Sequence, residues 1–257
     1  MMTILSKKGF KVALATVAAG ILPASAHAAT LQPNDFVGIS FWIISMAMVA
    51  ATVFFFMEAG RVSAKWRTSL TVAGLVTLIA AVHYFYMRDV WVATGETPTV
   101  YRYIDWLLTV PLQMVEFYLI LAAVGAVSAG IFWRLLIGSL VMLIAGYLGE
   151  AGYINVWLGF VIGMAGWIYI LYEIFAGEAG KASAESAPEA VQSAFNTMRL
   201  IVTVGWAIYP LGYFLGYMGG AVDAATLNVI YNVADFVNKI AFGLVIWNVA
   251  VTESESK

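Results

Sequence analysis

Apolar segments of about 20 residues repeat along the chain, and this repetition constrains the fold more than any other feature. A helix needs about 20 residues to cross the ~30 Å hydrocarbon core of a bilayer, whereas the strands of a membrane barrel are shorter and alternate in polarity. The segments are Phe36–Met57, Ser69–Tyr86, Thr99–Val124, Ile131–Leu148, Val156–Phe175, Val191–Met218 and Ala225–Val251. The sequence therefore predicts an all-α membrane protein, a seven-transmembrane-helix bundle.

Composition narrows the possible chemistry. With 62% hydrophobic and 11% charged residues in 257, the chain is more apolar than a soluble domain of this size. The absence of cysteine excludes disulfides and thiolate sites, and two histidines are too few for a histidine metal cluster, so no metal site is expected. A formal net charge of -2 without a basic run gives no sign of a nucleic-acid partner. The chemistry must rest on carboxylates, lysine and aromatic residues.

The N-terminus has the pattern of a secretory signal. Three lysines precede the apolar stretch Val12–Leu22, and small residues typical of a cleavage site follow at 24–28. We expect a cleavable signal peptide at 1–28 and a seven-helix domain at 29–257, the alternative being an uncleaved eighth helix. Arg61, Lys65 and Arg67 in the first connection favour a cytoplasmic location, which places the N-terminus outside and the C-terminus inside. A multi-pass protein of the bacterial inner membrane is expected.

The third segment carries charges that a lipid environment disfavours. Arg102, Asp105 and Glu116 together would cost roughly 7 to 10 kcal/mol if nothing compensated them. Arg102 lies near the end of the segment and could extend to the membrane surface, but a short carboxylate cannot. Asp105 and Glu116 share one helical face about 16 Å apart along the axis, with the Thr109 hydroxyl on the same flank. Two stacked carboxylates of this kind suit a proton relay.

The last segment supplies a group that could transfer the proton between them. Asp235 and Lys239 stand at i and i+4, on one face and one turn apart. Lys239 lies near mid-membrane, where an ionisable group is a functional-site hypothesis. One interpretation is a buried ion pair with the carboxylates. The other is a lysine that forms a Schiff base with a carbonyl ligand.

Aromatic residues accompany these charges. Trp206, Tyr209 and Tyr213 recur at three and four residues beside Pro210, and Trp106 follows Asp105. Such a stripe is common in simple packing, but a proline inside a span often marks a cavity.

Taken together, these motifs resemble the microbial rhodopsins, and within them the proteorhodopsin group, over essentially the whole mature chain. The residues that carry the resemblance are Arg102-Tyr103-x-Asp105-Trp106-x-x-Thr109, Trp206-x-x-Tyr209-Pro210 and Asp235-x-x-x-Lys239. The stretches RYIDWLLTVPLQMVEFYLIL and YNVADFVNKI look most like that group.

The resemblance implies a light-driven outward proton pump rather than an enzyme. Lys239 would carry all-trans retinal as a protonated Schiff base, with Asp105 as counterion and proton acceptor and Asp235 as second counterion. Glu116 would be the cytoplasmic proton donor, and Arg102 would orient the counterion network. The residues expected to line the chromophore are Trp106, Trp206, Tyr209, Pro210 and Tyr213.

Similar sodium pumps carry Asn-Asp-Gln where this chain has Asp105, Thr109 and Glu116, and similar chloride pumps have a neutral acceptor. The transported ion is therefore expected to be the proton.

Two competing functions remain open. A light sensor that signals to a partner usually lacks a carboxylic donor. A retinal-free transporter would use Lys239 and Asp235 as a structural or substrate-binding ion pair.

The resemblance also assigns residues beside the relay. A histidine at the place of His83 pairs with the acceptor carboxylate in proteorhodopsins and would broaden its titration, the alternative being a hydrogen-bonded core residue. Glutamine at the place of Gln113 is typical of the blue-absorbing type. Glu150 is expected in a solvated turn. Trp42, on the first segment, is a candidate for contacts in a homo-oligomer, and similar proteins form pentamers or hexamers.

Overall fold

The computed structural model describes residues 31–125 and 127–255. Internal contacts divide the chain into Met1–Leu31 and Gln32–Lys257, and every helix named below belongs to the second unit. Within the described residues, 7 helical stretches are long and apolar enough to cross a membrane, which confirms the predicted helix bundle. The predicted signal peptide and the alternative eighth helix lie outside the described residues.

The helices follow the predicted order, with additional short elements. They are α2 (Phe36–Glu58), the 3-10 turn η1 (Ala64–Trp66), α3 (Arg67–Thr94), α4 (Thr99–Ala122), α5 (Ala129–Glu150), α6 (Val156–Phe175), α7 (Glu178–Ser186), α8 (Glu189–Leu200), the π-helical turn η2 (Ile201–Gly205), α9 (Ile208–Tyr213), the π-helical turn η3 (Phe214–Met218) and α10 (Ala224–Glu255).

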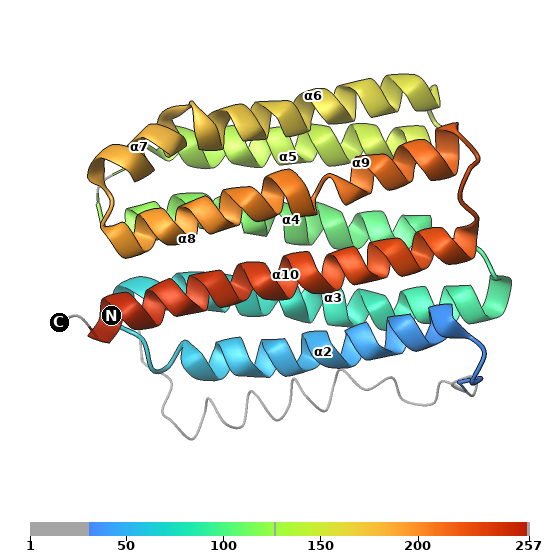
Figure 1. The fold of residues 1–257 in the computed structure, drawn as a ribbon, viewed down its shortest axis with the longest axis horizontal. Coiled ribbons are helices and arrows are strands. Elements are labelled where there is room, and N and C mark those ends of the chain that lie inside the picture. Colours follow the sequence, from blue (N-terminus) through green and yellow to red (C-terminus); the bar gives the residue numbers. More distant parts are fainter. Residues whose placement is uncertain (1–30, 126, 256–257) are drawn as a thin grey trace, which may run out of the picture. The chain divides into compact units, whose positions relative to one another are not determined.

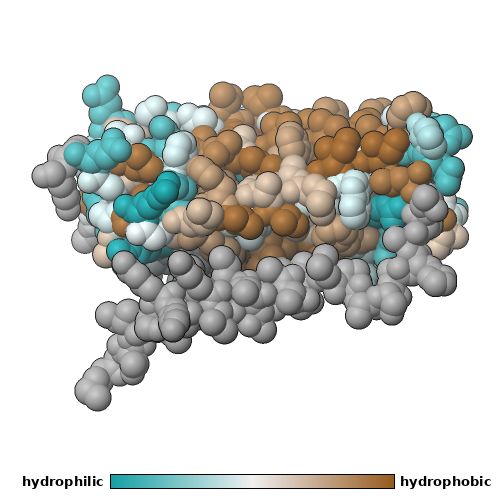
Figure 2. Space-filling view, turned by 90° about the horizontal axis from the view of Figure 1, so that it is seen from below, coloured by the Kyte–Doolittle hydropathy of each residue, from teal (hydrophilic) through white to brown (hydrophobic). Residues whose placement is uncertain are grey.

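Within this unit the long helices lie side by side (Figure 1), and the contacts between them close a ring. Each helix from α2 to α6 packs against the next one in the chain, α9 and η3 contact α6, and α10 contacts α2, α3, α8 and α9. The uncovered part of the face in Figure 2 is hydrophobic in the middle and hydrophilic at both ends, as a bilayer requires. Because α10 packs against both sides of the ring, its inward side chains meet residues from α3, α4 and α9.

Polar side chains define several helix ends. Asp35 accepts from the Gly38 N–H at 2.8 Å, Ser128 from Gly130 at 3.0 Å and Asn155 from Trp157 at 2.9 Å. Before α10, the hydrogen bond from the Thr226 backbone N–H lowers the pKa of the exposed Asp223 carboxyl. Gly95 ends α3 with φ +69°, a left-handed conformation that suits glycine. The residues next to these helix ends therefore determine where the helices begin and end.

The helices differ from the predicted segments in three main ways. Helix α3 extends beyond the predicted apolar segment to Thr94, and the left-handed Gly95 ends it. The connection after α6 contains α7, where the Glu173 carboxylate accepts from the Ala179 N–H at 3.1 Å. The sixth span is interrupted by η2 and η3, on either side of Pro210. Hydropathy predicts which residues lie in the bilayer, but it does not predict how the hydrogen bonds within each helix are arranged.

Helices α5 and α6 pack backbone to backbone through glycines. A Cβ atom on Gly159 would lie 2.8 Å from the Ala145 carbonyl oxygen, and one on Gly166 would lie 2.8 Å from the Met142 nitrogen. Both contacts are to main-chain atoms, which cannot turn aside. Glycine at these positions therefore allows the close approach of the two helices.

Candidate functional site

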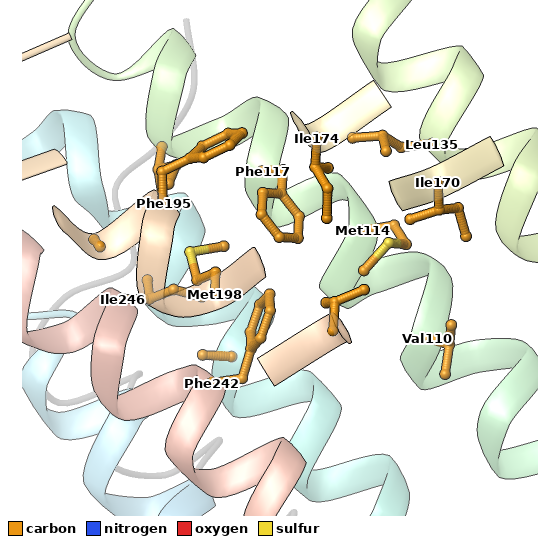
Figure 3. Close-up of a cluster of buried hydrophobic side chains, with 14 of the residues drawn as sticks. Val110, Met114, Phe117, Leu135, Ile170, Ile174, Phe195, Met198, Phe242 and Ile246 are labelled. Carbon is orange, nitrogen blue, oxygen red and sulfur yellow. The ribbon is translucent and has the colours of Figure 1, made fainter. Parts of the chain in front are cut away.

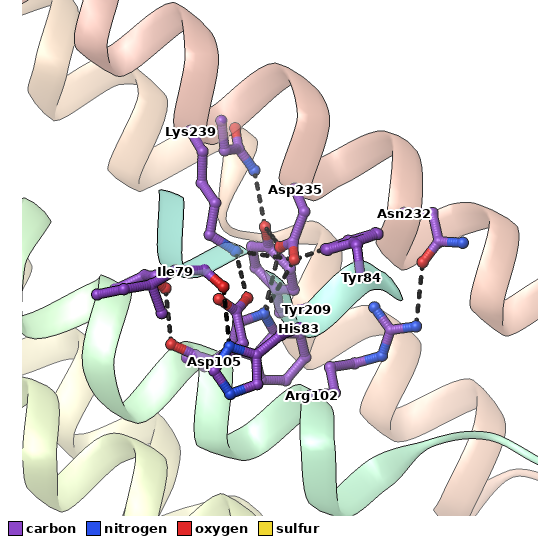
Figure 4. A network of polar contacts seen from close by, with 12 residues as sticks. Ile79, His83, Tyr84, Arg102, Asp105, Tyr209, Asn232, Asp235 and Lys239 are labelled. Carbon is purple, nitrogen blue, oxygen red and sulfur yellow. Dashed lines mark hydrogen bonds and ion pairs between the residues drawn. The ribbon is translucent and has the colours of Figure 1, made fainter. Parts of the chain in front are cut away.

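Lys239 lies at the centre of a buried cluster of charges (Figure 4). Its Nζ is 2.8 Å from Asp105 Oδ2 on α4 and 2.8 Å from Asp235 Oδ2 on its own helix. Lys239 is 3% exposed and both aspartates are fully buried. The spacing of four residues on α10 predicts the Asp235 contact, while the Asp105 contact depends on how α4 and α10 pack. Two carboxylates facing one cation compensate much of the cost of burying it.

Asp235 is the most heavily hydrogen-bonded group of the cluster. Its Oδ2 accepts from the Tyr84 hydroxyl at 2.8 Å, and its Oδ1 accepts from the Tyr209 hydroxyl at 2.7 Å. The Trp106 indole N–H lies 3.2 Å from Oδ1. Donors of this kind stabilise an ionised carboxylate and fix its orientation. Sequence reasoning missed Tyr84, which gives no signal in an apolar segment except that it follows His83.

Asp105 has a different environment. Its Oδ2 contacts Lys239, but its Oδ1 is buried with no hydrogen-bond partner among the described residues. The Thr109 hydroxyl donates to the Asp105 main-chain carbonyl at 2.9 Å, not to the carboxylate. His83 is close enough to interact electrostatically with Asp105, while its Nδ1 makes a 2.8 Å hydrogen bond with the Ile79 carbonyl. Asp105 therefore keeps one oxygen available to accept a proton or another donor.

Arg102 lies inside the bundle, so the alternative that it extends to the membrane surface is wrong. It is 1% exposed, and its Nη2 donates to Asn228 Oδ1 at 2.8 Å and to Asn232 Oδ1 at 3.1 Å. Asn232 in turn donates to the Ser40 hydroxyl at 2.9 Å. Polar residues at 228, 232, 235 and 239 recur every three or four positions of an apolar helix, a signal that could have predicted this face. We call this region, from Asp235 to Asn228, the Arg102 half.

Glu116 lies on the other side of Lys239 in apolar surroundings. It is 1% exposed, and neither carboxyl oxygen makes a hydrogen bond of good geometry, although the Ser69 hydroxyl lies beside it. Figure 3 shows a cluster of buried hydrophobic side chains that includes Phe117, the residue after Glu116 on α4. The cluster also includes Met114, Leu135, Ile174, Phe195, Met198, Phe242 and Ile246. We call this region the Glu116 half. Burial without a cation favours the protonated, neutral form of a carboxyl group.

A cavity extends from Lys239 toward α5 and α6. It is partly open to solvent. Seven residues expected at the chromophore line it, namely Trp106, Gln113, Trp206, Tyr209, Pro210, Tyr213 and Lys239. Met142, Gly146, Gly163 and Trp167 also line it, and sequence reasoning missed them.

The cavity suits a mostly apolar molecule with a polar group near Lys239. Its walls are mostly aromatic and aliphatic, and its ionisable lining residues include Lys239, Asp235 and Glu150, the first two in contact with each other. The retinal polyene and its carbonyl carbon have this distribution of polarity. A lysine nitrogen inside the cavity would hold the carbonyl end, and the aromatic residues would pack along the chain.

Glu150 differs from its predicted place in a solvated turn. It is the last residue of α5, lines the cavity and accepts from the Tyr103 hydroxyl at 2.9 Å. The helix continues to Glu150 because Tyr103 on α4 provides a polar partner at this depth. The turn therefore begins at Ala151, two residues later than predicted.

Comparisons with known proteins agree with this geometry. The family model described as bacteriorhodopsin-like protein matches residues 35–253. The green-light absorbing proteorhodopsin of Gamma-proteobacterium EBAC31A08 is 58% identical over 249 residues, covering 96% of this chain and 97% of that protein. The blue-light absorbing proteorhodopsin of Gamma-proteobacterium Hot 75m4 is 64% identical over 228 residues, covering 88% and 90%.

A solved structure gives the same result for the fold. The crystal structure of a blue light-absorbing proteorhodopsin from Med12 is 56% identical and matches with a TM-score of 0.75, covering 85% of this chain and 100% of that chain. The match over nearly all of each relative, with a buried lysine in the last helix and a cavity beside it, leaves one conclusion. The chain belongs to the bacteriorhodopsin-like family of microbial rhodopsins; it is a multi-pass bacterial membrane protein, and its chromophore is retinal.

Proposed function

We propose that this protein is a light-driven proton pump that moves protons outward and absorbs blue light. The observation that carries the proposal is Lys239 Nζ, which lies 2.8 Å from each of two buried aspartates and lines a mostly apolar cavity. When bound to Lys239, all-trans retinal supplies a light-absorbing protonated Schiff base that changes shape on illumination. The orientation expected from the positive-inside rule sets the direction of transport.

The two aspartates have separate roles in this proposal. Asp235 is held by Tyr84, Tyr209 and Trp106, so it is the better permanent counterion. Asp105 has an unpartnered Oδ1, so its negative charge is less well stabilised by donors and it is the better acceptor for the proton of the Lys239 nitrogen. Arg102 keeps a positive charge beside the pair through its contacts with Asn228 and Asn232.

Glu116 is the proposed donor that restores the proton. A neutral carboxyl that is 1% exposed is shielded from water at the surface, so it can hold a proton until the Lys239 nitrogen needs it. The position of Glu116 on the opposite side of Lys239 from Arg102 gives the transport a direction. A sensor has no need for such a donor, so the geometry favours the pump.

Blue absorption and oligomerisation are further parts of the proposal. Gln113 lines the cavity, and its Nε2 lies 3.4 Å from the Asn238 main-chain oxygen, which supports a tuning role for this amide. The 64% identity with a blue-absorbing relative supports this tuning. Trp42 is 40% exposed and packs on Phe85, which leaves an aromatic face available for contact with a second copy in a pentamer or hexamer.

The test is reconstitution of the expressed chain with all-trans retinal. We expect a visible absorption band, its loss in Lys239→Ala, and light-induced acidification outside cells that an uncoupler abolishes. Asn248→Ala is a matched control, because Asn248 is an exposed residue of the same helix. No band in the wild type would overturn retinal binding. A band without a pH change would support the sensor instead.

A further inference from the structure

Arg102 is a buried cation that is held by neutral groups. The side chain is 1% exposed, and its guanidinium forms no ion pair with a carboxylate among the described residues. Its Nη2 donates to the side-chain oxygens of Asn228 and Asn232 at 2.8 and 3.1 Å. The guanidinium carbon also lies 5.3 Å from the centre of the Tyr231 ring. Amide oxygens and aromatic rings carry no net charge, so these contacts position the cation without neutralising it.

Each of the two asparagines is oriented by a second hydrogen bond. The Asn232 amide nitrogen donates to the Ser40 hydroxyl on α2 at 2.9 Å, and that hydroxyl donates to the Val37 carbonyl at 2.8 Å. The Asn228 amide nitrogen donates to the Ala224 carbonyl at 2.9 Å. Because each amide nitrogen already has an acceptor, the amide oxygen faces the guanidinium. Residues of α2 and α10 therefore determine the position of the guanidinium.

Arg102 and Asp105 each keep polar atoms without a partner. Arg102 Nε and Nη1 are buried and make no hydrogen bond among the described residues, and neither does Asp105 Oδ1. The two residues stand at i and i+3 on α4, so their side chains are neighbours on the helix surface. In Figure 4 the dashed contact of Arg102 runs to Asn232, and none runs to Asp105. A guanidinium that was not held on α10 would be attracted to this carboxylate.

We propose that the two asparagines and Ser40 are positioning residues, which keep the Arg102 guanidinium away from the Asp105 carboxylate. The inference rests on the proposed pump and deepens it, because it takes Asp105 as the acceptor for the proton of the Lys239 nitrogen. A cation paired with a carboxylate stabilises the ionised form and opposes protonation. With the guanidinium held on α10, Asp105 accepts the proton more readily. The positioning residues act through Arg102 and do not touch the transferred proton.

Other titratable groups face the acceptor and the guanidinium, and the test leaves them in place. Those that face Asp105 are His83 and Tyr84 on α3, Tyr209 on α9, and Asp235 and Lys239 on α10. Those that face Arg102 are Tyr84 on α3, Glu150 on α5, Tyr217 in η3, and Tyr231 and Asp235 on α10. Because none of them is substituted, a change in the titration of Asp105 reports the position of the guanidinium.

Two substitutions of different severity release the guanidinium. Asn232→Leu keeps the branched shape of the side chain and removes the acceptor for Arg102. Ser40→Ala is milder, because it leaves Asn232 in place and removes only the hydroxyl that orients its amide. It also decides the question if Asn232→Leu does not fold. Asn248→Leu, at an exposed position of the same helix, is the matched control.

The experiment measures the pH at which the visible absorption band changes as Asp105 takes up a proton. In Asn232→Leu the released guanidinium pairs with Asp105, and the midpoint should move by about 1 to 3 pH units to lower pH, the range for a carboxylate that gains an adjacent cation. Ser40→Ala should give a smaller shift in the same direction, and Asn248→Leu none. In an Arg102→Gln background, Asn232→Leu should have no effect of its own, because no guanidinium is left to release.

A midpoint that stays in place or rises in every variant that folds would overturn the inference, as would an equal shift of Asn232→Leu in the Arg102→Gln background. The infrared carbonyl band of protonated Asp105, assigned by its loss in Asp105→Asn, gives the same titration without retinal. It therefore decides on the positioning role even if the wild type fails to absorb or to acidify the medium, which would overturn the pump. If the wild type absorbs and acidifies the medium while Asn232→Leu and Ser40→Ala titrate as it does, only the positioning role is wrong.

Discussion

The Arg102 half and the Glu116 half both bury carboxylates, but they do so in opposite ways. In the Arg102 half, Asp235 receives hydrogen bonds from Tyr84, Tyr209 and Trp106 and an ion pair from Lys239. In the Glu116 half, the carboxyl has apolar neighbours and no hydrogen bond of good geometry. The first arrangement stabilises charge, while the second favours a neutral acid.

Because of this difference, we expect Asp235 and Glu116 to respond differently to the same kind of substitution. Removing a carboxylate that holds several partners leaves those partners buried and unpaired, which costs stability. Removing a carboxyl without partners leaves nothing unpaired, so the folded state is little affected. The cost then falls on proton transfer alone.

The largest effect is expected for Asp235→Asn. The amide cannot accept from Tyr84 and Tyr209 as a carboxylate does, and it leaves Lys239 with one counterion. The free energy of unfolding should fall by about 3 to 5 kcal/mol, the range for breaking a buried ion pair. Thermal unfolding of the protein without retinal in detergent measures it. A loss no larger than that of the control Asn248→Ala would remove the basis of the comparison.

Glu116→Gln should show the reverse behaviour. We expect the free energy of unfolding to change by less than about 1 kcal/mol, because no partner is lost. Recovery of absorbance after a flash should slow by about 100-fold, since a positioned proton donor contributes about that factor or more. Flash spectroscopy and thermal unfolding on one preparation give both values. A variant that unfolds much earlier yet recovers at the wild-type rate would contradict the assignment.

The sequence predicts part of this arrangement. The i, i+4 spacing places Asp235 beside Lys239, and the shared helical face of Asp105 and Glu116 follows from their separation of 11 residues. The partners from other helices cannot be derived in this way, since they depend on how α3, α4 and α10 pack. Tyr84 is the clearest case, because nothing in its neighbourhood distinguishes it from a packing residue.

The π-helical turns and Glu150 show a second limit. Pro210 predicts a local break, but not that Gly205 would need a donor from α10 or Val202 one from α6. The partner of Glu150, Tyr103, lies 47 residues away in the chain. Local signals therefore establish where a helix is disturbed, and tertiary packing determines which side chain repairs it.

His83→Asn is expected to have an intermediate effect, and it tests the environment of Asp105. His83 interacts electrostatically with Asp105, whose Oδ1 has no partner among the described residues. If the two groups titrate together, the pH titration of the visible band should become narrower and its midpoint should move. Spectrophotometric titration of wild type and variant makes the comparison. An unmoved midpoint would show that His83 is only a core residue bonded to Ile79.

Gln113→Leu is expected to have the smallest effect, confined to colour. The substitution removes a polar amide from the cavity wall at nearly constant volume and leaves the charge cluster intact. The absorption maximum should move to longer wavelength with little change in stability. An absorption spectrum of the purified pigment measures the shift, and an unchanged maximum would discard the proposed blue tuning.

The glycine contacts between α5 and α6 have a consequence for engineering the protein. A methyl group on Gly159 or Gly166 would collide with main-chain atoms of the opposite helix, so these two positions cannot hold larger side chains. Room for a bulkier synthetic dye must come from trimming side chains on the other walls, such as Trp206 or Tyr213. Libraries for new colours should therefore spare the glycines of this wall and diversify the aromatic positions opposite.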